Sequence, residues 1–197
     1  TRFLNIMQDE AERMNRLVGD LMSLDRVEGN ERVRPTQRVV LNDIIQSTCH
    51  SLQPLALQAG VKFEFESPEL PVEIYGDSDQ LTQVFTNIIG NALKYGASGG
   101  RITLRMTTIA REAAFRAPGV RLQVIDYGAG IDPVHLPRLT ERFYRVDGHR
   151  SRELGGTGLG LAIVKHIINR HRGKLNIKSA LGEGTTVTVM LPTEPLS

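Results

Sequence analysis

A glycine-rich turn late in the chain carries the clearest chemical information in the sequence. It reads Gly155-Gly156-Thr157-Gly158-Leu159-Gly160 and directly precedes an apolar segment with helical spacing. Because the first turn of a helix has free N–H groups and the positive end of the helix dipole, this turn suits an anion such as phosphate. It lacks the Lys-Ser/Thr ending of a P-loop and does not follow the first strand, which excludes the P-loop and dinucleotide-binding motifs.

Two other motifs contain residues that could bind a nucleotide together with this turn. The sequence Asp126-Tyr127-Gly128-Ala129-Gly130 ends an apolar strand, where a carboxylate can accept an amino hydrogen of adenine and glycines let a ring approach. A polar helix face is formed, at spacings of three and four, by Asn87, Asn91, Lys94 and Tyr95. Taken alone, the 126–130 segment is equally well explained as an ordinary turn. A polar helix face taken alone is more often simply exposed to solvent. A nucleotide site follows only from their combination.

The elements that position these motifs follow from hydrophobic periodicity. Helical spacing predicts helices over 3–27, 41–55, 77–95, 133–139 and 159–172. Alternation predicts strands over 61–66, 72–75, 101–108, 120–126, 174–179 and 185–191. We expect Asn42 or Asp43 to cap the second helix, 111–118 to be a connection, and 145–157 to be irregular and mobile. The prediction is an α+β fold, a two-layer α/β sandwich with helices on one face of a mixed sheet.

The first helix has a narrow apolar seam that is typical of helix pairs. The seam consists of Phe3, Met7, Met14, Leu17, Leu21 and Leu24. We therefore expect this helix to pack on another helix or another chain. The predicted organisation is a helix over 1–30, a linker over 31–38 and a globular domain over 39–197.

Composition excludes several classes of protein. The net charge is +2, from 24 basic and 22 acidic residues without a block of one sign, which gives no footprint for nucleic acid. A single cysteine, Cys49, excludes an internal disulfide and fits a reducing compartment. No segment approaches the roughly 20 apolar residues that cross a bilayer, so we expect a soluble chain. Since Thr1 lies in a continuing helix, we also expect a piece of a longer protein.

In this order, the motifs resemble the catalytic domain of bacterial sensor histidine kinases, in the superfamily shared with gyrase, Hsp90 and MutL ATPases. The resemblance spans nearly the whole chain, and 136–160 is especially similar to the phosphate-responsive, PhoR-type branch. The matching segments are 87–95 for the N box, 126–130 and 156–161 for the two glycine boxes, 141–145 for the F box, and 182–186 for the closing hairpin. This implies a Bergerat-type, mostly antiparallel sheet preceded by an amphipathic helix.

The resemblance also implies roles within a site for Mg²⁺ and ATP. Asn91 would give its amide oxygen to Mg²⁺, and Asn87 would assist through the metal's water shell. The implied catalytic residues are Asn87, Lys94 and Arg145. The implied nucleotide-binding residues are Asn87, Asn91, Lys94, Tyr95, Asp126, Gly128, Gly130, Ile131, Phe143, Arg145, Gly156, Thr157, Gly158, Leu159, Gly160 and Leu161. Among these, Asp126 would bind adenine, and the turn before the last helix would be the hinge of a lid.

Asn87 favours phosphoryl transfer over hydrolysis. The ATP-hydrolysing relatives have a glutamate at this place, which can activate water, whereas an amide has no useful basicity. The acceptor would be a histidine followed by an acidic residue and, a few places on, Thr-Pro. The chain has no histidine in that pattern, since its histidines are His50, His135, His149, His166 and His171.

The resemblance identifies 1–30 as the second helix of a dimerisation hairpin whose first helix is absent. We therefore expect this chain to bind Mg·ATP without phosphorylating itself. The implied partners are a dimerisation domain with the acceptor histidine and a response regulator, in a homodimeric parent whose cytoplasmic part this would be. Two alternatives stay open: an ATP-hydrolysing or anti-sigma-type serine kinase relative on the same fold, and a non-catalytic nucleotide-binding module that acts through its first helix.

Overall fold

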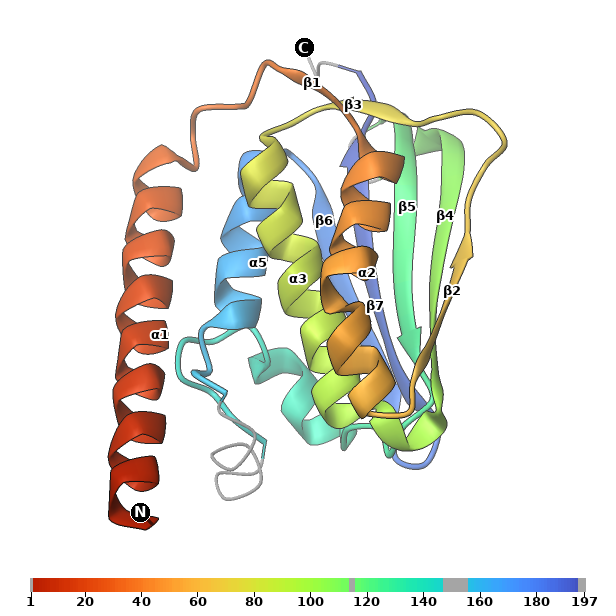
Figure 1. Cartoon of the computed structure of the whole chain (residues 1–197). Helices are drawn as coiled ribbons and strands as arrows, with labels where there is room; N and C mark the ends of the chain where they lie inside the picture. Colours follow the sequence, from red (N-terminus) through yellow and green to blue (C-terminus); the bar gives the residue numbers. More distant parts are fainter. Residues whose placement is uncertain (1, 114–115, 147–155, 195–197) are drawn as a thin grey trace.

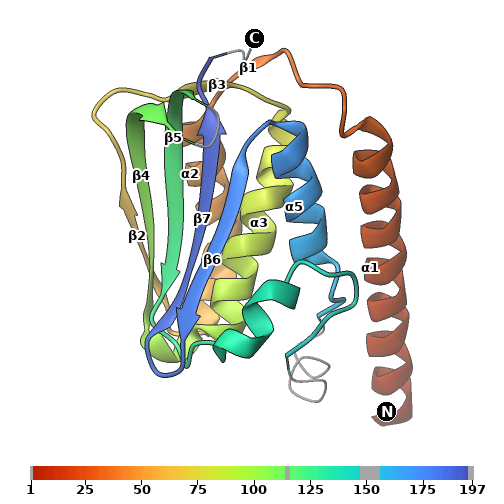
Figure 2. The same cartoon turned by 180° about the vertical axis from the view of Figure 1, so that it is seen from behind.

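The computed structural model describes residues 2–113, 116–146 and 156–194 (Figure 1). Helices α2, α3 and α5 cover one face of a five-stranded sheet, and α1 stands beside α5 at the edge of the helical layer (Figures 1 and 2). The helices are α1 (Arg2–Asn30), α2 (Leu41–Gln58), α3 (Ser78–Tyr95) and α5 (Gly160–Arg170), with 3-10 turns η1 (Ala97–Gly99) and η2 (Pro133–Arg138). The strands are β1 (Arg38–Val40), β2 (Lys62–Glu66), β3 (Glu73–Tyr75), β4 (Arg101–Glu112), β5 (Ala117–Asp126), β6 (Lys174–Ala180) and β7 (Gly184–Pro192).

The sheet is mixed and mostly antiparallel, as expected. Its strand order is β2-β4-β5-β7-β6, in which β2 and β4 run parallel while the other neighbours run antiparallel. In this register Asp126 lies opposite Ile102 of β4 and Thr185 of β7. The carboxylate at the end of β5 therefore comes from an interior strand that has neighbours on both sides.

Helix α3 separates its apolar and polar faces as its sequence predicts. Its buried residues are Leu81, Val84, Phe85, Ile88, Ile89, Ala92 and Leu93. Asp77 caps its first turn by accepting a hydrogen bond from the Gln80 backbone N–H at 3.1 Å. The buried side anchors the helix on the sheet, so the amides of Asn87 and Asn91 are held on a fixed support.

Helix α2 begins differently from the prediction. Neither Asn42 nor Asp43 caps it, because the capping position is Val40, the last residue of a short strand that the sequence did not reveal. This strand, β1, pairs with β3 and is too short for alternation to show. The Asn42 side chain instead accepts a hydrogen bond from the Val72 N–H at 2.8 Å.

Most of the described residues in the predicted connection over 111–118 are strand, and 114–115 lie outside the described residues. β4 continues to Glu112 and β5 begins at Ala117, with a shift of register between Ile109 and Glu112. The segment contains Ala and Pro, which have low strand propensity, so pairing with neighbouring strands decides its conformation.

Helix α1 uses only part of its predicted seam. Leu24 and Val27 are each 2% exposed in the main core, where α1 packs against α5, and Leu17 is partly buried there. Val27 was not in the seam, whereas the seam residues Met7, Met14 and Leu21 are exposed. Its C-terminal half thus belongs to the core.

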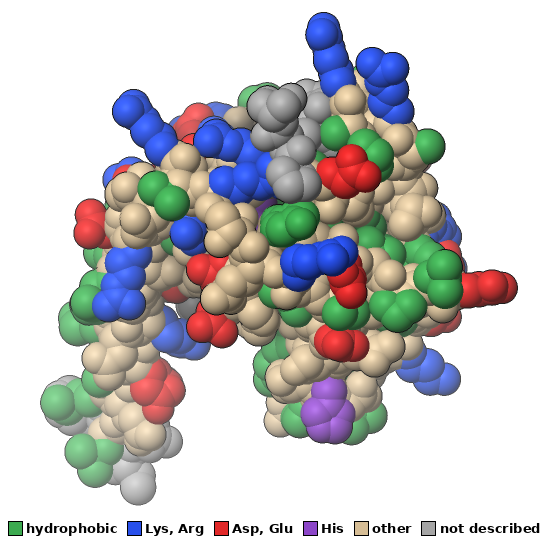
Figure 3. All heavy atoms as spheres, turned by 90° about the horizontal axis from the view of Figure 1, so that it is seen from above, with side chains coloured by type: hydrophobic (Ala, Val, Ile, Leu, Met, Phe, Trp, Pro, Cys, Tyr) green, Lys and Arg blue, Asp and Glu red, His purple; other side chains and the backbone are tan. Residues whose placement is uncertain are grey.

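In the described part of the chain, no helix combines the length and apolarity that crossing a membrane requires. Side chains of both charges are spread over the face seen from above (Figure 3).

Candidate functional site

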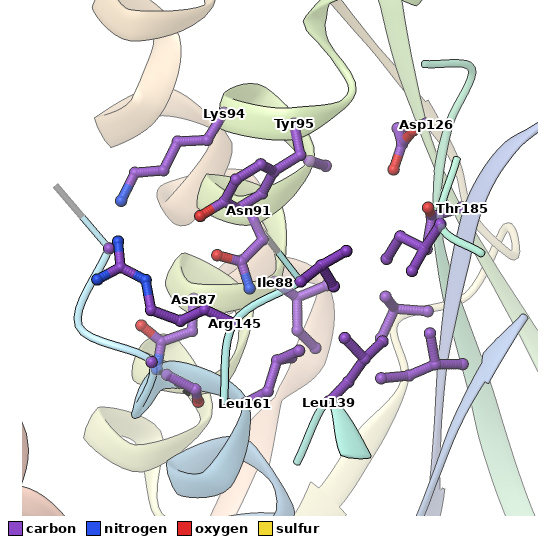
Figure 4. Close-up of a pocket in the computed structure, with 18 of the residues that line it drawn as sticks. Asn87, Ile88, Asn91, Lys94, Tyr95, Asp126, Leu139, Arg145, Leu161 and Thr185 are labelled. Carbon is purple, nitrogen blue, oxygen red and sulfur yellow. Dashed lines mark hydrogen bonds between the residues drawn. The ribbon is translucent and has the colours of Figure 1, made fainter. Parts of the chain in front are cut away.

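The three motifs meet at one cavity of about 430 Å³ between α3, the ends of the central strands and the turn before α5 (Figure 4). Thirteen predicted site residues line it: Asn87, Asn91, Lys94, Tyr95, Asp126, Gly130, Ile131, Arg145, Gly156, Thr157, Gly158, Gly160 and Leu161. Since these come from segments far apart in the chain, the fold brings together what the sequence showed separately.

One end of the cavity holds a buried carboxylate beside apolar side chains. Asp126 is 7% exposed, and its Oδ1 accepts a hydrogen bond from the Gly128 N–H at 3.0 Å. Burial raises the pKa of this carboxyl, and backbone hydrogen bonds from Gly128 and Thr185 oppose that rise. The apolar lining includes Ile88, Ala92, Val124, Leu139, Ile177 and Val187. An apolar slot with one acceptor suits a flat ring that carries an amino group.

The other end of the cavity is cationic. Figure 4 shows Lys94, Arg145 and Asn87 on the side away from Asp126, with Asn91 and Tyr95 between. Partial burial lowers the pKa of Lys94, whose side chain still reaches solvent, and the neighbouring charge of Arg16 lowers it further. Cationic and amide groups at this end suit an anion, so the cavity has the polarity of a nucleotide with its base and phosphates at opposite ends.

Backbone and side-chain contacts hold the glycine turn against α3. The amide of Asn87 donates to the Gly160 carbonyl at 3.3 Å, and the Phe143 N–H donates to the Gly158 carbonyl at 2.9 Å. Gly158 has a φ of 76°, and a Cβ there would lie 2.9 Å from the Cα of Phe143. Glycine is therefore required where the turn passes over the 141–145 segment.

Three predicted binding residues do not line the cavity. Gly128 faces the end of α3, since a Cβ there would lie 2.5 Å from the Cα of Gly96, so its absence of a side chain serves close packing. Phe143 is 55% exposed, and Leu159 is fully buried in the core. Gly155, which opens the glycine turn, lies outside the described residues.

Sequence reasoning missed several lining residues. Arg16 and Asp20 reach the cavity from α1, and Thr185 reaches it from β7. Tyr144 also lines it, and its hydroxyl lies 2.6 Å from Nδ1 of His135. Tyr144 stood inside a recognised motif and could have been found there. The two α1 residues carried no signal, because charged residues on an exposed helix face are ordinary.

Comparison with known proteins now identifies the domain. Residues 76–195 match the model of the histidine kinase-, DNA gyrase B-, and HSP90-like ATPase family. The chain belongs to this ATPase family. Its ATP-binding fold agrees with the polarity of the cavity and confirms the resemblance inferred from the motif order.

The relatives of this ATPase domain are sensor kinases. The phosphate regulon sensor protein PhoR of Pseudomonas aeruginosa is 40% identical over 188 residues, which are 95% of this chain and 40% of that protein. The sensor histidine kinase WalK of Bacillus subtilis is 36% identical over 191 residues, which are 97% of this chain and 30% of that protein. The chain therefore spans less than half the length of these relatives.

A solved structure has the same fold. The mycobacterial sensor histidine kinase MprB is 28% identical, with a TM-score of 0.67 over 81% of this chain and 99% of that chain. The predicted two-layer fold of the ATPase domain is thereby confirmed.

Proposed function

We propose that this chain is the catalytic domain of a sensor histidine kinase, which holds Mg·ATP and donates its γ-phosphoryl group to a histidine on a dimerisation helix. One observation carries the proposal: in an ATPase-family fold, a buried carboxylate lies at one end of a cavity of about 430 Å³, and Lys94 and Arg145 lie at the other end. The adenine amino group would bind Asp126, and the phosphates would lie near Lys94, Arg145 and Thr157.

The residues present fit Mg²⁺ as a nucleotide-bound ion. Asn91 and Asn87 offer amide oxygens, which are hard ligands, at the middle and the cationic end of the cavity (Figure 4). Within the described residues, no group of three or more His, Cys, Asp or Glu side chains could hold a metal by itself. Asn91 would therefore share the ion with phosphate oxygens and water. The ion would supply positive charge that neutralises the phosphates.

The site favours transfer to a protein acceptor over hydrolysis. The described carboxylates that line the cavity are Asp126, at the adenine end, and Asp20, which accepts a hydrogen bond from Thr157 at 2.6 Å. Asn87 holds the Gly160 carbonyl and cannot act as a base toward water. Catalysis would then consist of positioning the donor and neutralising its charge.

The acceptor would be supplied by another helical domain. Among the histidines, His171 is 1% exposed. Its Nε2 accepts a hydrogen bond from the Asp77 N–H at 3.0 Å, and its Nδ1 lies 2.7 Å from the Ile167 carbonyl oxygen, so its role is structural. His149 lies outside the described residues. We further propose that the parent is a homodimeric inner-membrane sensor with this domain in the cytoplasm, and that a response regulator receives the phosphoryl group.

Labelled ATP tests this proposal. The chain is incubated with γ-labelled ATP and Mg²⁺, alone and with a separately prepared helical domain that carries the acceptor histidine. We expect label on the added domain only. Label on this chain alone would contradict the proposal, steady phosphate release would favour the hydrolase, and no nucleotide binding at all would favour the non-catalytic module.

A further inference from the structure

Helix α1 contributes a carboxylate to the phosphate end of the cavity. It lies outside the sheet and its three covering helices, yet its residues Arg16 and Asp20 line the cavity (Figure 1). Oδ2 of the half-buried Asp20 accepts a hydrogen bond from Oγ1 of Thr157 at 2.6 Å. The same Oγ1 accepts from the Leu159 N–H at 3.3 Å. The Asp20 carboxylate is therefore bound to the glycine turn itself.

The groups around Asp20 are those that a phosphate would use. Lys94 lies within electrostatic reach of Asp20. Burial and the charge of Arg16 lower the pKa of Lys94, and the negative charge of Asp20 raises it. A carboxylate and a phosphate oxygen are both anions that accept charge-assisted hydrogen bonds. The carboxylate thus provides, from within the chain, the negative charge that this end of the cavity favours.

We propose that Asp20 competes with the terminal phosphates of ATP for the anion site formed by Lys94 and Thr157. When α1 lies against α5, the carboxylate occupies part of that site, and a triphosphate brought close to it meets like-charge repulsion. Docking of α1 and binding of ATP therefore oppose each other, and undocked α1 leaves the site to the nucleotide. The inference rests on the proposed function, because it requires phosphates at this end of the cavity.

A latch remote from the cavity holds α1 in place. Nδ1 of His166 on α5 lies 2.6 Å from Glu31, and its Nε2 lies 3.1 Å from Glu28. Because carboxylates only accept, both contacts are hydrogen bonds when the imidazole is protonated on both nitrogens. Arg142 also pairs with Glu28. Glu28, Glu31 and His166 do not line the cavity, so changing them loosens α1 without removing a group that lines the nucleotide site.

The first test is Asp20→Asn in the 197-residue chain. It removes the charge and keeps the shape and an acceptor oxygen. Calorimetric titration with Mg²⁺ present should show ATP binding about tenfold tighter, because a close like charge at a partly solvated site is worth about one decade or more. AMP, which lacks the outer phosphates, should bind as to the parent. Asp25→Asn, the same change at an exposed position of α1, is the matched control and should alter neither nucleotide.

The second test loosens the latch with the double change Glu28→Gln and Glu31→Gln. It should also tighten ATP binding, and its combination with Asp20→Asn should give less than the product of the separate effects, since both act through one docking equilibrium. If Asp20→Asn leaves ATP binding unchanged or weaker, or shifts AMP equally, the inference is wrong while the proposed function stands. If neither the parent nor any variant binds ATP or AMP, the proposed function is wrong, and the inference is wrong with it.

Discussion

Replacement of Asp126 by asparagine should change which base the cavity prefers. The Asp126 carboxylate accepts backbone hydrogen bonds from Gly128, at 3.0 Å to Oδ1, and from Thr185. Each carboxylate oxygen has two lone pairs, so an acceptor position remains for the amino group of a ligand. An asparagine that keeps the Gly128 contact with its carbonyl oxygen places its NH₂ group where Oδ2 was. Two donors then face each other at the adenine amino group, and the favourable hydrogen bond becomes an unsatisfied one.

The size of this effect follows from burial. At 7% exposure, water does not readily replace the lost partner of Asp126. A hydrogen bond to a charged group contributes about 1.5–3 kcal/mol, which corresponds to a loss of roughly 10- to 150-fold in ATP affinity. Inosine triphosphate carries an oxygen in place of the amino group, and this oxygen can accept from the new NH₂. The variant should therefore prefer inosine triphosphate, whereas the parent prefers ATP.

Calorimetric titration of both nucleotides against the parent and Asp126→Asn measures this reversal. Asp43→Asn, an exposed acidic position on α2, makes the same chemical change away from the cavity and should leave both affinities unchanged. Equal ATP affinity in parent and Asp126→Asn would refute the assignment of the base to this carboxylate. Equal weakening of both nucleotides would show that the substitution damages the fold of the β5 end and does not alter base recognition.

Three further predictions address the metal, the buried histidine and a glycine. Asn91→Ala should remove most of the Mg²⁺ dependence of ATP binding, and an undiminished dependence in a titration with and without Mg²⁺ would exclude this ligand. Burial lowers the pKa of His171, whose neutral ring accepts a hydrogen bond from the Asp77 N–H. The free energy of unfolding should therefore fall as pH drops below about 6.5, by at most about 1.4 kcal/mol per pH unit. Urea denaturation of the His171→Gln variant should not show this pH dependence. Gly130→Ala should cost about 2–3 kcal/mol, because its φ is 71° and a Cβ would lie 1.9 Å from a carbonyl oxygen, while Gly19→Ala in open space on α1 should be neutral or stabilising in the same denaturation assay.

Long periodic segments were predictable because burial on one face is recorded in the sequence itself. Helical spacing predicted α3 over 77–95, and the polar face of this helix forms a wall of the cavity. The start of α2 was not predictable in the same way. Val40 opens it from a short strand that pairs with β3, in which Val40 lies opposite Glu73. Local side-chain capping rules cannot detect a helix start fixed by such a distant partner.

The motifs predicted correctly which segments form the cavity, but they predicted the role of individual glycines less well. Asp126, Asn91 and the glycine turn converge as expected, because each motif ends or begins an element that the sheet aligns. Gly128 was expected to admit the ring, yet its missing side chain makes room for Gly96. A close backbone approach and a ligand approach both require glycine, so the sequence alone does not distinguish them.

Competition between α1 and ATP has a reciprocal consequence. If release of α1 tightens ATP binding by some factor, ATP must favour the release of α1 by the same factor. Hydrogen exchange of the α1 amides around Leu24 and Val27, which are each 2% exposed in the docked helix, should therefore quicken when ATP binds. AMP should leave the exchange unchanged, and Asp20→Asn should abolish the difference between the nucleotides. Faster exchange with AMP as well would mean that filling the cavity, and not phosphate charge, displaces the helix. A domain built in this way would couple the charge of its bound nucleotide to the position of its first helix.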